Sequence, residues 1–331
     1  MGVFCVNLPA YRGAVLVRND NGTLFEEVKG FADEANERLN RLDTRFQVAS
    51  GSKGFVAVGI LKLIEEGKLT FHSRLSDLVD FDLEQIDPEV TVEQLLTHTS
   101  GVPDYFDESI MDDYDELWVD YPCYKIRKSE DLLPLFIHKP MMYPRGKKFQ
   151  YNNTGFVLLG IIIEKVTGML FDQYLKQVLF DPAGMDGTGY FESDRLPGNC
   201  ANAYMRDRRT GGMCTNIFAV DAKGTGAGGA FTSVIDMDKF WRALYSGKII
   251  SPEMLRKATT VHAGEGDAHY GLGFWLNDRG NGFIPSLEGC DPGVCFMSEF
   301  DPHSGTTATV ISNYGDDVWA LHEALREYYT K

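Results

Sequence analysis

The sequence predicts an α+β fold in which both ends of the chain supply strands to one antiparallel sheet and a mainly helical segment is inserted between them. Strand patterns occur near the N-terminus, helical periodicity dominates the middle, and strand patterns return after residue 271. Elements segregated in this way are typical of α+β proteins, whereas alternating strands and helices would indicate a doubly wound sheet. The 331 residues, with 44% apolar and 24% charged residues, are sufficient for a large core.

The first predicted element is a hairpin. Residues 13–17 (GAVLV) are rich in β-branched side chains, the run NDNG at 19–22 is typical of a turn, and residues 23–28 provide the return strand. The strands predicted near the other end, and the last helix after them, span residues 271–276, 294–300, 306–312 and 318–329.

The middle of the chain predicts helices. One is expected over residues 55–68, because Val56, Ile60 and Leu63 recur on one face and Gly67 closes the element. The further helices predicted in this way span residues 92–96, 132–138, 151–166, 171–179, 235–245 and 252–257.

Two long polar stretches interrupt the helices. Residues 104–131 are acidic, and residues 192–229 are rich in Gly, Asn, Asp and Arg. Loops of this length in a compact domain are usually functional lids or disordered. The aromatic residues between 105 and 124 are equally consistent with an acyl pocket and with a packed lid.

Charge and composition restrict the partners. A net charge of −16 argues against nucleic acid and anionic membranes, which need a basic surface. The longest apolar stretch, residues 156–163, is shorter than the about 20 residues that span a bilayer. The first residues, MGVFCVNLPAYRG, show no secretory signal, so a cytoplasmic location is expected, although an exported chain without its leader would look the same.

The cysteines show no zinc-binding spacing and are expected to be free thiols of a reducing compartment. Only Cys290 and Cys295 are close in sequence. The other cysteines are Cys5, Cys123, Cys200 and Cys214.

The first chemical motif is VASGSKGF, in which Ser50 precedes Lys53 by three residues at the predicted start of a helix. Residues three apart on a helix share a face, so the amine can reach the hydroxyl. A serine becomes a nucleophile when a base takes its proton, and a lysine with a lowered pKa can be that base. Taken alone, the motif is also explained by a serine that caps a helix and a solvated lysine.

The second motif is FQYNNTG, in which Tyr151 and Asn153 precede an apolar helix. A tyrosine near a lysine ammonium could lose its proton more easily and move protons to a leaving group. Asn153 could hold a substrate carbonyl or amide. An asparagine cap with a tyrosine packed on the helix is an equally good explanation of this motif alone.

These two motifs, about 100 residues apart, resemble the serine β-lactamase and penicillin-binding-protein superfamily. The branch is that of class C β-lactamases, DD-peptidases and related esterases. The resemblance covers nearly the whole chain: the other matching segments are VEQLLTHTSGVPDY, residues 143–191, GTGAGGAFTSVIDMDKF, HYGLGFWL and TTATVISNYG.

The resemblance implies a β-lactamase/transpeptidase-like fold and roles for the residues above. Ser50 would be the nucleophile, Lys53 its proton acceptor, Tyr151 the proton shuttle, and Asn153 a substrate holder. The reaction would be acyl transfer through a covalent acyl-enzyme. The implied domains are a discontinuous sheet domain of residues 1–52 and 225–331 and a mainly helical domain of residues 53–224, with the active site in the cleft between them.

The third element of the family departs from its usual form. The family has Lys-Thr-Gly or His-x-Gly on a strand that lines the site, but alignment on Pro292-Gly293 gives Leu287-Glu288-Gly289. Only Gly289 is kept, and the second oxyanion N–H would come from Cys290. The missing basic side chain normally meets a substrate carboxylate, which favours esters or amides without one. His303 or Arg279 could supply charge from elsewhere.

Other candidates carry less. The glycine-rich run at residues 224–229 lacks the preceding strand and the lysine of a nucleotide loop, so it is expected to line the site. His98 is expected to be a buried, hydrogen-bonded histidine. The remaining histidines show no metal-ligand spacing, and no metal or organic cofactor is implied.

The sequence therefore predicts a serine hydrolase that acts on a peptide, amide or ester, with a small molecule or peptide as its substrate and no membrane span. Its oligomeric state is not indicated. Two alternatives stay open: a carboxylesterase without β-lactam activity, and a catalytically weak member of the fold that binds a ligand or peptide.

Overall fold

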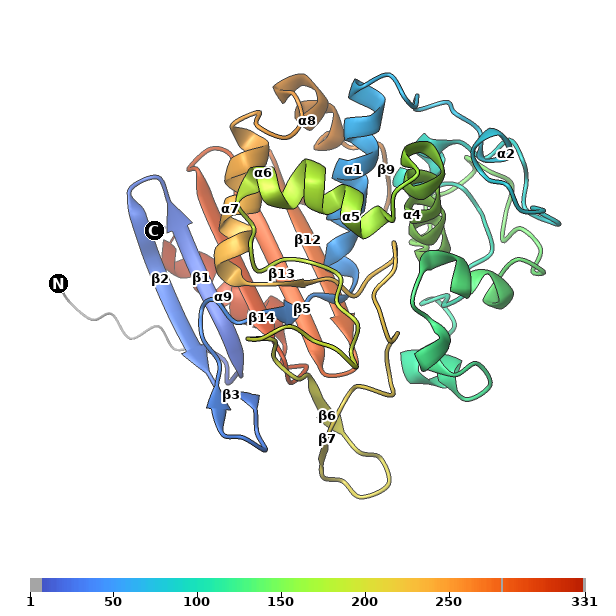
Figure 1. Ribbon diagram of the computed structural model, residues 1–331. Coiled ribbons are helices and arrows are strands. Elements are labelled where there is room, and N and C mark those ends of the chain that lie inside the picture. Colours follow the sequence, from blue (N-terminus) through green and yellow to red (C-terminus); the bar gives the residue numbers. More distant parts are fainter. Residues whose placement is uncertain (1–7, 281, 330–331) are drawn as a thin grey trace.

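An eight-stranded antiparallel sheet forms the centre of the computed structural model, which describes residues 8–280 and 282–329 (Figure 1). The α+β class is confirmed, because the strands come from the two ends of the chain and most helices from between them. In sheet order the strands are β2 (Gly22–Lys29), β1 (Gly13–Asn19), β14 (Thr306–Ser312), β13 (Val294–Asp301), β12 (Phe283–Asp291), β11 (Trp275–Asp278), β10 (Ala268–Tyr270) and β9 (Ala263–Glu265).

Strands from the two ends of the chain pair with each other near one edge of this sheet. Strand β1 pairs with β2 on one side and with β14 on the other, where Val15 lies opposite Val310. The predicted N-terminal hairpin and the strands at 294–300 and 306–312 are confirmed. The strand predicted over 271–276 is wrong in its bounds, since β10 ends at Tyr270 and β11 begins at Trp275.

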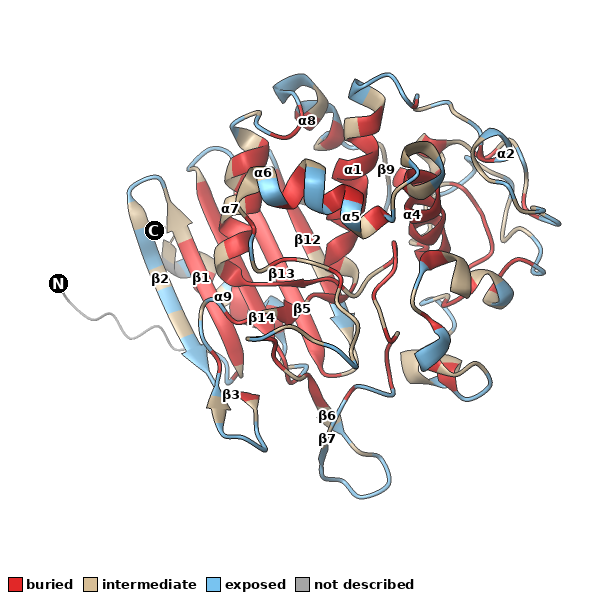
Figure 2. Ribbon diagram, in the orientation of Figure 1, coloured by how far each residue is buried: buried red, intermediate tan, exposed pale blue. Residues whose placement is uncertain are grey.

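Strand β1 is buried along most of its length (Figure 2), and its alternating residues belong to two separate cores. Ala14 and Leu16 of β1 belong to a large core with the helices of one face, whereas Val15 and Val17 pack with the C-terminal helix α9 on the other face. A strand covered on both faces is apolar along its whole length, which explains the run GAVLV. Helix α9 (Val318–Tyr329) matches the helix predicted at 318–329.

The remaining helices cover the face opposite α9 and extend beyond the edge of the sheet. Helix α1 packs on α4, and α7 packs on β1 and β14. These helices are α1 (Lys53–Glu65), α2 (Leu75–Leu78), α3 (Val92–Leu96), α4 (Asn153–Thr167), α5 (Phe171–Leu175), α6 (Asp181–Ala183), α7 (Val234–Tyr245) and α8 (Pro252–Ala258).

Two predicted helices differ from the structure. The segment predicted at 132–138 is the 3-10 helix η4 (Ser129–Leu135), which contains Pro134, a residue without the N–H that an α-helix needs. The helix predicted at 171–179 continues past α5 as a π-helical turn, η5 (Lys176–Phe180), into α6.

Helix α4 shows how local sequence fixes an element. The Asn152 side chain accepts a hydrogen bond from the Gly155 N–H and begins the helix, and Gly168, at a φ of 70°, ends it. Over residues 8–280 and 282–329, no helix by itself has the length and apolar character to cross a membrane, and one bent pair, α4 with residues 171–183, meets those criteria together.

The long polar loops contain short elements beside the sheet. Residues 104–131 include the 3-10 helices η2 (Tyr114–Trp118) and η3 (Cys123–Lys125), and residues 192–229 include a hairpin of β6 (Tyr204–Arg206) and β7 (Met213–Thr215). The small strands elsewhere are β3 (Phe31–Asp33), β4 (Arg38–Leu39), β5 (Phe46–Gln47) and β8 (Phe231–Thr232).

Candidate active site

Ser50 lies in a 3-10 turn, η1 (Ala49–Ser52), that leads directly into α1. Ala49 has a φ of 46°, a left-handed conformation that a residue with a side chain adopts at a cost of about 1–3 kcal/mol. The helix cap is Ser52 and not Ser50, and it makes no side-chain cap bond. The alternative of a capping serine at position 50 is therefore wrong.

Lys53 is 2% exposed and is held by three acceptors. Its Nζ donates to the Ser50 Oγ at 2.8 Å, to the Asn153 Oδ1 at 2.8 Å and to the carbonyl oxygen of Ala227. Burial lowers the pKa of Lys53 from 10.5 to about 8, against smaller opposing effects of carboxylates led by Glu108. The alternative of a solvated lysine is wrong, and a fraction of the amine is neutral near pH 7.

Asn153 is the first residue of α4 and lies between Lys53 and the acidic loop. Its backbone N–H donates to Asp104 at 2.8 Å, and its side-chain Nδ2 donates to the Phe106 carbonyl at 3.0 Å and to Glu108 at 3.1 Å. Asp104 thereby fixes the start of α4. Burial raises the pKa of Asp104 to about 6, against these hydrogen bonds.

Tyr151 is half-buried beside the lysine, with Nζ of Lys53 5.0 Å from its ring centre. Its ring stacks on Trp275 at 5.7 Å with 13° between the planes. Burial raises the pKa of Tyr151 well above 10, and Glu108 raises it further. The prediction that the phenol loses its proton more easily here is therefore wrong, and Tyr151 is a neutral hydrogen-bond donor.

His98 supports the segment that carries Tyr151. It is buried, its Nδ1 accepts the Asn152 N–H at 3.0 Å, and its ring lies 4.5 Å from that of Tyr151. Burial, followed by the charge of Lys53, lowers the pKa of His98 well below 6.5, so the imidazole is neutral. A buried, hydrogen-bonded histidine is what the sequence predicted.

Gly289 of β12 lies directly against the turn that carries Ser50. A Cβ at this position would be 2.5 Å from the Val48 carbonyl oxygen, 2.6 Å from the Gly51 nitrogen and 2.7 Å from the Ser50 nitrogen. Only glycine permits this approach, and it brings the strand end with Cys290 beside Ser50. β12 was not among the strands that the residue pattern predicted.

Leu287 aligns with the basic residue that lines the site in the family, but its side chain does not line the cavity at Ser50. It is 3% exposed, and its Cδ2 lies 2.4 Å from where a Cβ on Gly54 of α1 would be. It is not among the described residues that line the cavity at Ser50. This side chain fills space against α1 and does not face a substrate.

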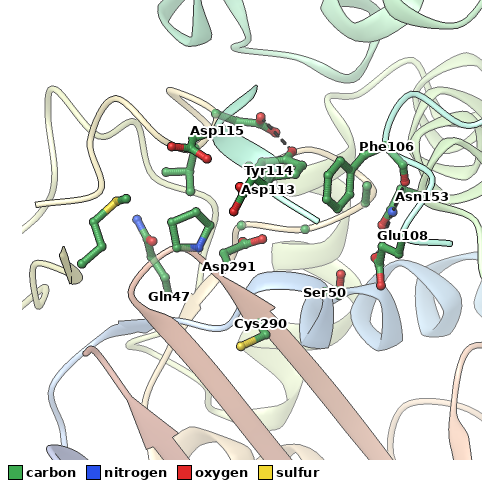
Figure 3. Close-up of a pocket in the computed structure, with 18 of the residues that line it drawn as sticks. Gln47, Ser50, Phe106, Glu108, Asp113, Tyr114, Asp115, Asn153, Cys290 and Asp291 are labelled. Atoms are coloured by element: carbon green, nitrogen blue, oxygen red, sulfur yellow. Dashed lines mark hydrogen bonds between the residues drawn. The ribbon is translucent and has the colours of Figure 1, made fainter. Parts of the chain in front are cut away.

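A cavity of about 640 Å³ opens at Ser50 and Asn153 (Figure 3). It is bordered by the end of β12, the acidic loop and the glycine-rich run at 224–229, as expected for that run. The charged residues in its lining are Glu108, Asp112, Asp113, Asp115, Arg206, Arg208, Asp221 and Asp291.

Several of these positions were missed in the sequence. Asp221 and Asp291 stand in no motif, and Glu108 appeared only as one of many acids in a loop. Ala227 acts through its carbonyl, so its side chain gives no indication of its contact with Lys53. The aromatic residues Tyr105, Phe106 and Tyr114 do line the cavity.

The cysteine prediction is wrong for one pair. Cys290 and Cys295 lie opposite each other on β12 and β13 and form a disulfide. The thiols of Cys123, Cys200 and Cys214 are free, and Cys5 lies outside the described residues.

Comparison with known proteins identifies the family. A family model described as Beta-lactamase matches residues 8–326. The penicillin binding protein from Bacillus halodurans is 39% identical, with a TM-score of 0.92 over 96% of this chain and 97% of that one. Penicillin-binding protein 4* of Bacillus subtilis is 29% identical over 305 residues, which are 87% of this chain and 64% of the relative. The chain thus spans just under two thirds of that relative.

A more distant structure shares the fold. The octameric penicillin-binding protein homologue from Pyrococcus abyssi is 24% identical, with a TM-score of 0.82 over 96% of this chain and 73% of that one. The family model covers nearly all of the sequence, and the segments that resembled the superfamily lie within it. The chain belongs to the beta-lactamase family, within the serine β-lactamase and penicillin-binding-protein superfamily.

Proposed function

We propose that the protein is a serine hydrolase that transfers the acyl group of an ester or amide to water through an acyl-enzyme on Ser50. The observation that carries the proposal is the 2.8 Å contact between the Ser50 Oγ and the Lys53 Nζ at the wall of a cavity. A serine with an adjacent base of lowered pKa is the arrangement that nucleophilic catalysis requires.

In the first half-reaction, neutral Lys53 takes the Ser50 proton while Oγ attacks the substrate carbonyl carbon. The N–H groups of Ser50 and Cys290 would stabilise the tetrahedral oxyanion, which the contact of Gly289 with the nucleophile turn supports. The bond to the leaving group then breaks. Its proton comes from Lys53 by way of the Tyr151 hydroxyl, which gives one proton as it accepts another.

In the second half-reaction, water attacks the acyl carbon, the same groups move its proton, and Ser50 is restored. Asn153 would act mainly as a positioning residue, because its amide is already bonded to Lys53, Phe106 and Glu108. Holding the substrate would require one of these bonds to be exchanged.

Among the candidate substrates, esters and amides without a carboxylate are favoured over penicillins and D-Ala-D-Ala peptides. Position 287 carries a buried leucine, and the end of β12 presents Asp291 to the cavity. A carboxylate entering there would meet an acidic side chain in place of the basic one that the family usually provides, which disfavours it.

Covalent labelling tests the proposal. The protein is incubated with a fluorophosphonate and, separately, with a fluorescent penicillin, and the adducts are located by mass spectrometry. We expect a phosphonate adduct on Ser50 that Ser50→Ala abolishes and that Ser76→Ala, an exposed control, keeps. Penicillin labelling should be at least tenfold slower. Folded protein that neither reagent labels would refute the nucleophile and favour a ligand-binding role.

A further inference from the structure

Asp291 is the last residue of β12, two positions beyond the glycine that touches the nucleophile turn. Its carboxyl group borders the same cavity as Ser50 (Figure 3). Within the part of the chain that the structure describes, its carboxylate has no hydrogen-bond donor. A carboxylate set in a cavity wall without a donor or a cation is costly and is usually compensated by a ligand or a proton.

Asp221 is a second acidic residue in the lining of the same cavity. Its Oδ1 accepts a hydrogen bond from the Tyr114 hydroxyl at 3.1 Å, and it also borders the cavity. The charge of Asp221 acts on Asp291 and is the largest charge effect there, while Glu108 adds a smaller one in the same sense. Asp291 therefore lies within electrostatic range of both Asp221 and Glu108.

The positive groups in the cavity lining, and Lys53 beside it, have other partners. Lys53 is bonded to Ser50, Asn153 and Ala227. Arg208 is paired with Asp113 at 2.6 Å and with Asp115 at 3.4 Å.

Arg206 is exposed on the β6–β7 hairpin and donates to the Gly211 carbonyl. Burial, more than any neighbouring charge, raises the pKa of Asp291 to about 8 and that of Asp221 to about 7. The charge of Lys53 lowers the pKa of Asp291, but by less than burial raises it.

We propose that Asp221 and Asp291 form a subsite for a protonated amine of the substrate, so that the protein selects cationic esters or amides and rejects anionic ones. The inference rests on the proposed acyl transfer at Ser50 and specifies its substrate class. A cavity of about 640 Å³ fits a small aminoacyl or aminoalkyl compound. An ammonium group in this subsite would favour the ionised form of both carboxyls and donate charge-assisted hydrogen bonds to them.

Protection of Ser50 against a fluorophosphonate tests the subsite without requiring turnover. The three ligands are benzylamine, benzyl alcohol and benzoate, which share one shape and differ in charge. At pH 7 we expect benzylamine to halve the labelling rate at a concentration at least tenfold below that of benzyl alcohol, and benzoate to protect least. Asp291→Asn and Asp221→Asn should each raise, at least fivefold, the benzylamine concentration that halves the labelling rate. Asp267→Asn, which removes an exposed carboxylate outside the cavity lining, should leave it unchanged.

Turnover provides the second measurement. Alanine p-nitroanilide in both enantiomers should exceed its N-acetyl and N-succinyl derivatives in kcat/KM by at least tenfold, and Asp291→Asn should reduce that preference to less than threefold. Equal protection by benzylamine and benzyl alcohol, or tighter binding of benzoate, would overturn the subsite. If the fluorophosphonate does not label Ser50 in the unmodified protein, the proposed acyl transfer itself is overturned. Failure of the subsite and failure of the acyl transfer therefore give different results.

Discussion

The Nζ of Lys53 lies 2.8 Å from the Oγ of Ser50, and the same nitrogen is bonded at 2.8 Å to Asn153, which begins another helix. The lysine therefore joins the turn before α1 to the start of α4. Its position is fixed from both sides, so the distance to the serine does not depend on a flexible side chain in solvent. The proposed catalysis and the packing of these two helices therefore depend on one residue.

Replacing Lys53 with Met separates these two contributions. We expect the rate of Ser50 acylation by an uncharged ester to fall by about 10²–10⁴-fold, because the base is lost. Rates of adduct formation followed by mass spectrometry measure this. Lys68→Met, on an exposed lysine after α1, is the matched control. Retention of more than a tenth of the rate in Lys53→Met would contradict the assigned base.

The same variant should be more stable than the unmodified protein at neutral pH. The folded-state pKa of Lys53 is lowered from 10.5 to about 8, so below pH 8 the folded protein bears the full cost of a buried ammonium, about 3 kcal/mol. The cost disappears as pH rises from about 8 to 10.5, because the folded state loses its proton first. Chemical denaturation should show that the gain in unfolding free energy of Lys53→Met over the unmodified protein is smaller at pH 10 than at pH 7. An equal gain at the two pH values would contradict the lowered pKa of Lys53.

Activity should follow the same ionisation. With an uncharged ester, kcat/KM should rise about tenfold per pH unit below pH 8 and level off above it, since Lys53 must be neutral to act as the base. Glu108 holds the pKa of Lys53 up, so Glu108→Gln should move the midpoint to lower pH. Glu116→Gln, an exposed acid in the same loop, should leave the midpoint in place. A midpoint that moves to higher pH in Glu108→Gln would show that Glu108 does not raise the pKa of Lys53.

Gly289→Ala should damage the site more than the fold. The added Cβ would stand within 2.7 Å of the Ser50 nitrogen and must displace either β12 or the nucleophile turn. We expect kcat to fall by about 10²-fold or more, the effect of a misplaced oxyanion donor. Gly198→Ala, which meets nothing within 4 Å, is the control. Steady-state kinetics and thermal unfolding should be measured together, and unchanged kcat in folded Gly289→Ala would refute the close approach.

Tyr151→Phe should affect the proton transfers while it leaves the structure intact. The phenylalanine ring can keep the stacking on Trp275, and a hydroxyl with a raised pKa contributes little as an anion. We expect kcat to fall by about 10²–10⁴-fold with less than about 1 kcal/mol change in unfolding free energy. Tyr124→Phe, 62% exposed, serves as the control. A variant that turns over normally would exclude Tyr151 as the proton shuttle.

Leu287→His should not restore recognition of a carboxylate. The imidazole would be buried against Gly54 without a polar partner, at a cost of about 1–3 kcal/mol. Penicillin labelling should stay slow, whereas Phe283→His, at an exposed position of the same strand, should cost little stability. Faster penicillin labelling in a stable Leu287→His variant would show that this side chain does reach the substrate.

The parts of the fold that follow from local patterns were predictable. Residues 92–96 form a helix with the predicted bounds, and the apolar run at 13–17 forms a strand. β12 was missed because Pro285 and the sequence LEGCD hide its alternation, and its pairing with β11 and β13 holds it in the sheet. Pro134 is visible in the sequence, but the residue pattern did not predict that the helix around it would be a 3-10 helix.

The candidate site also has parts that the sequence predicts and parts that it does not. Ser50 and Lys53 are three residues apart, so their contact could be inferred from helical geometry alone. Asp221 and Asp291 are brought together by the loop and the sheet, and no local pattern marks them. The pKa of Tyr151 was predicted in the wrong direction, because a nearby cation was weighed and the cost of burial was not.

The pairing of β1 with β14 has a consequence for how the protein comes into being. These strands are neighbours in the sheet but lie near opposite ends of the described chain. The chain between them must therefore bring the two strands together before they can pair. Contacts between such distant segments slow folding, because their ordering entropy is lost before their contacts form. During synthesis, the segment with Ser50 and Lys53 leaves the ribosome long before β12 exists. A nascent chain therefore carries Ser50 and Lys53, yet the proposed active site is incomplete until β12 is in place.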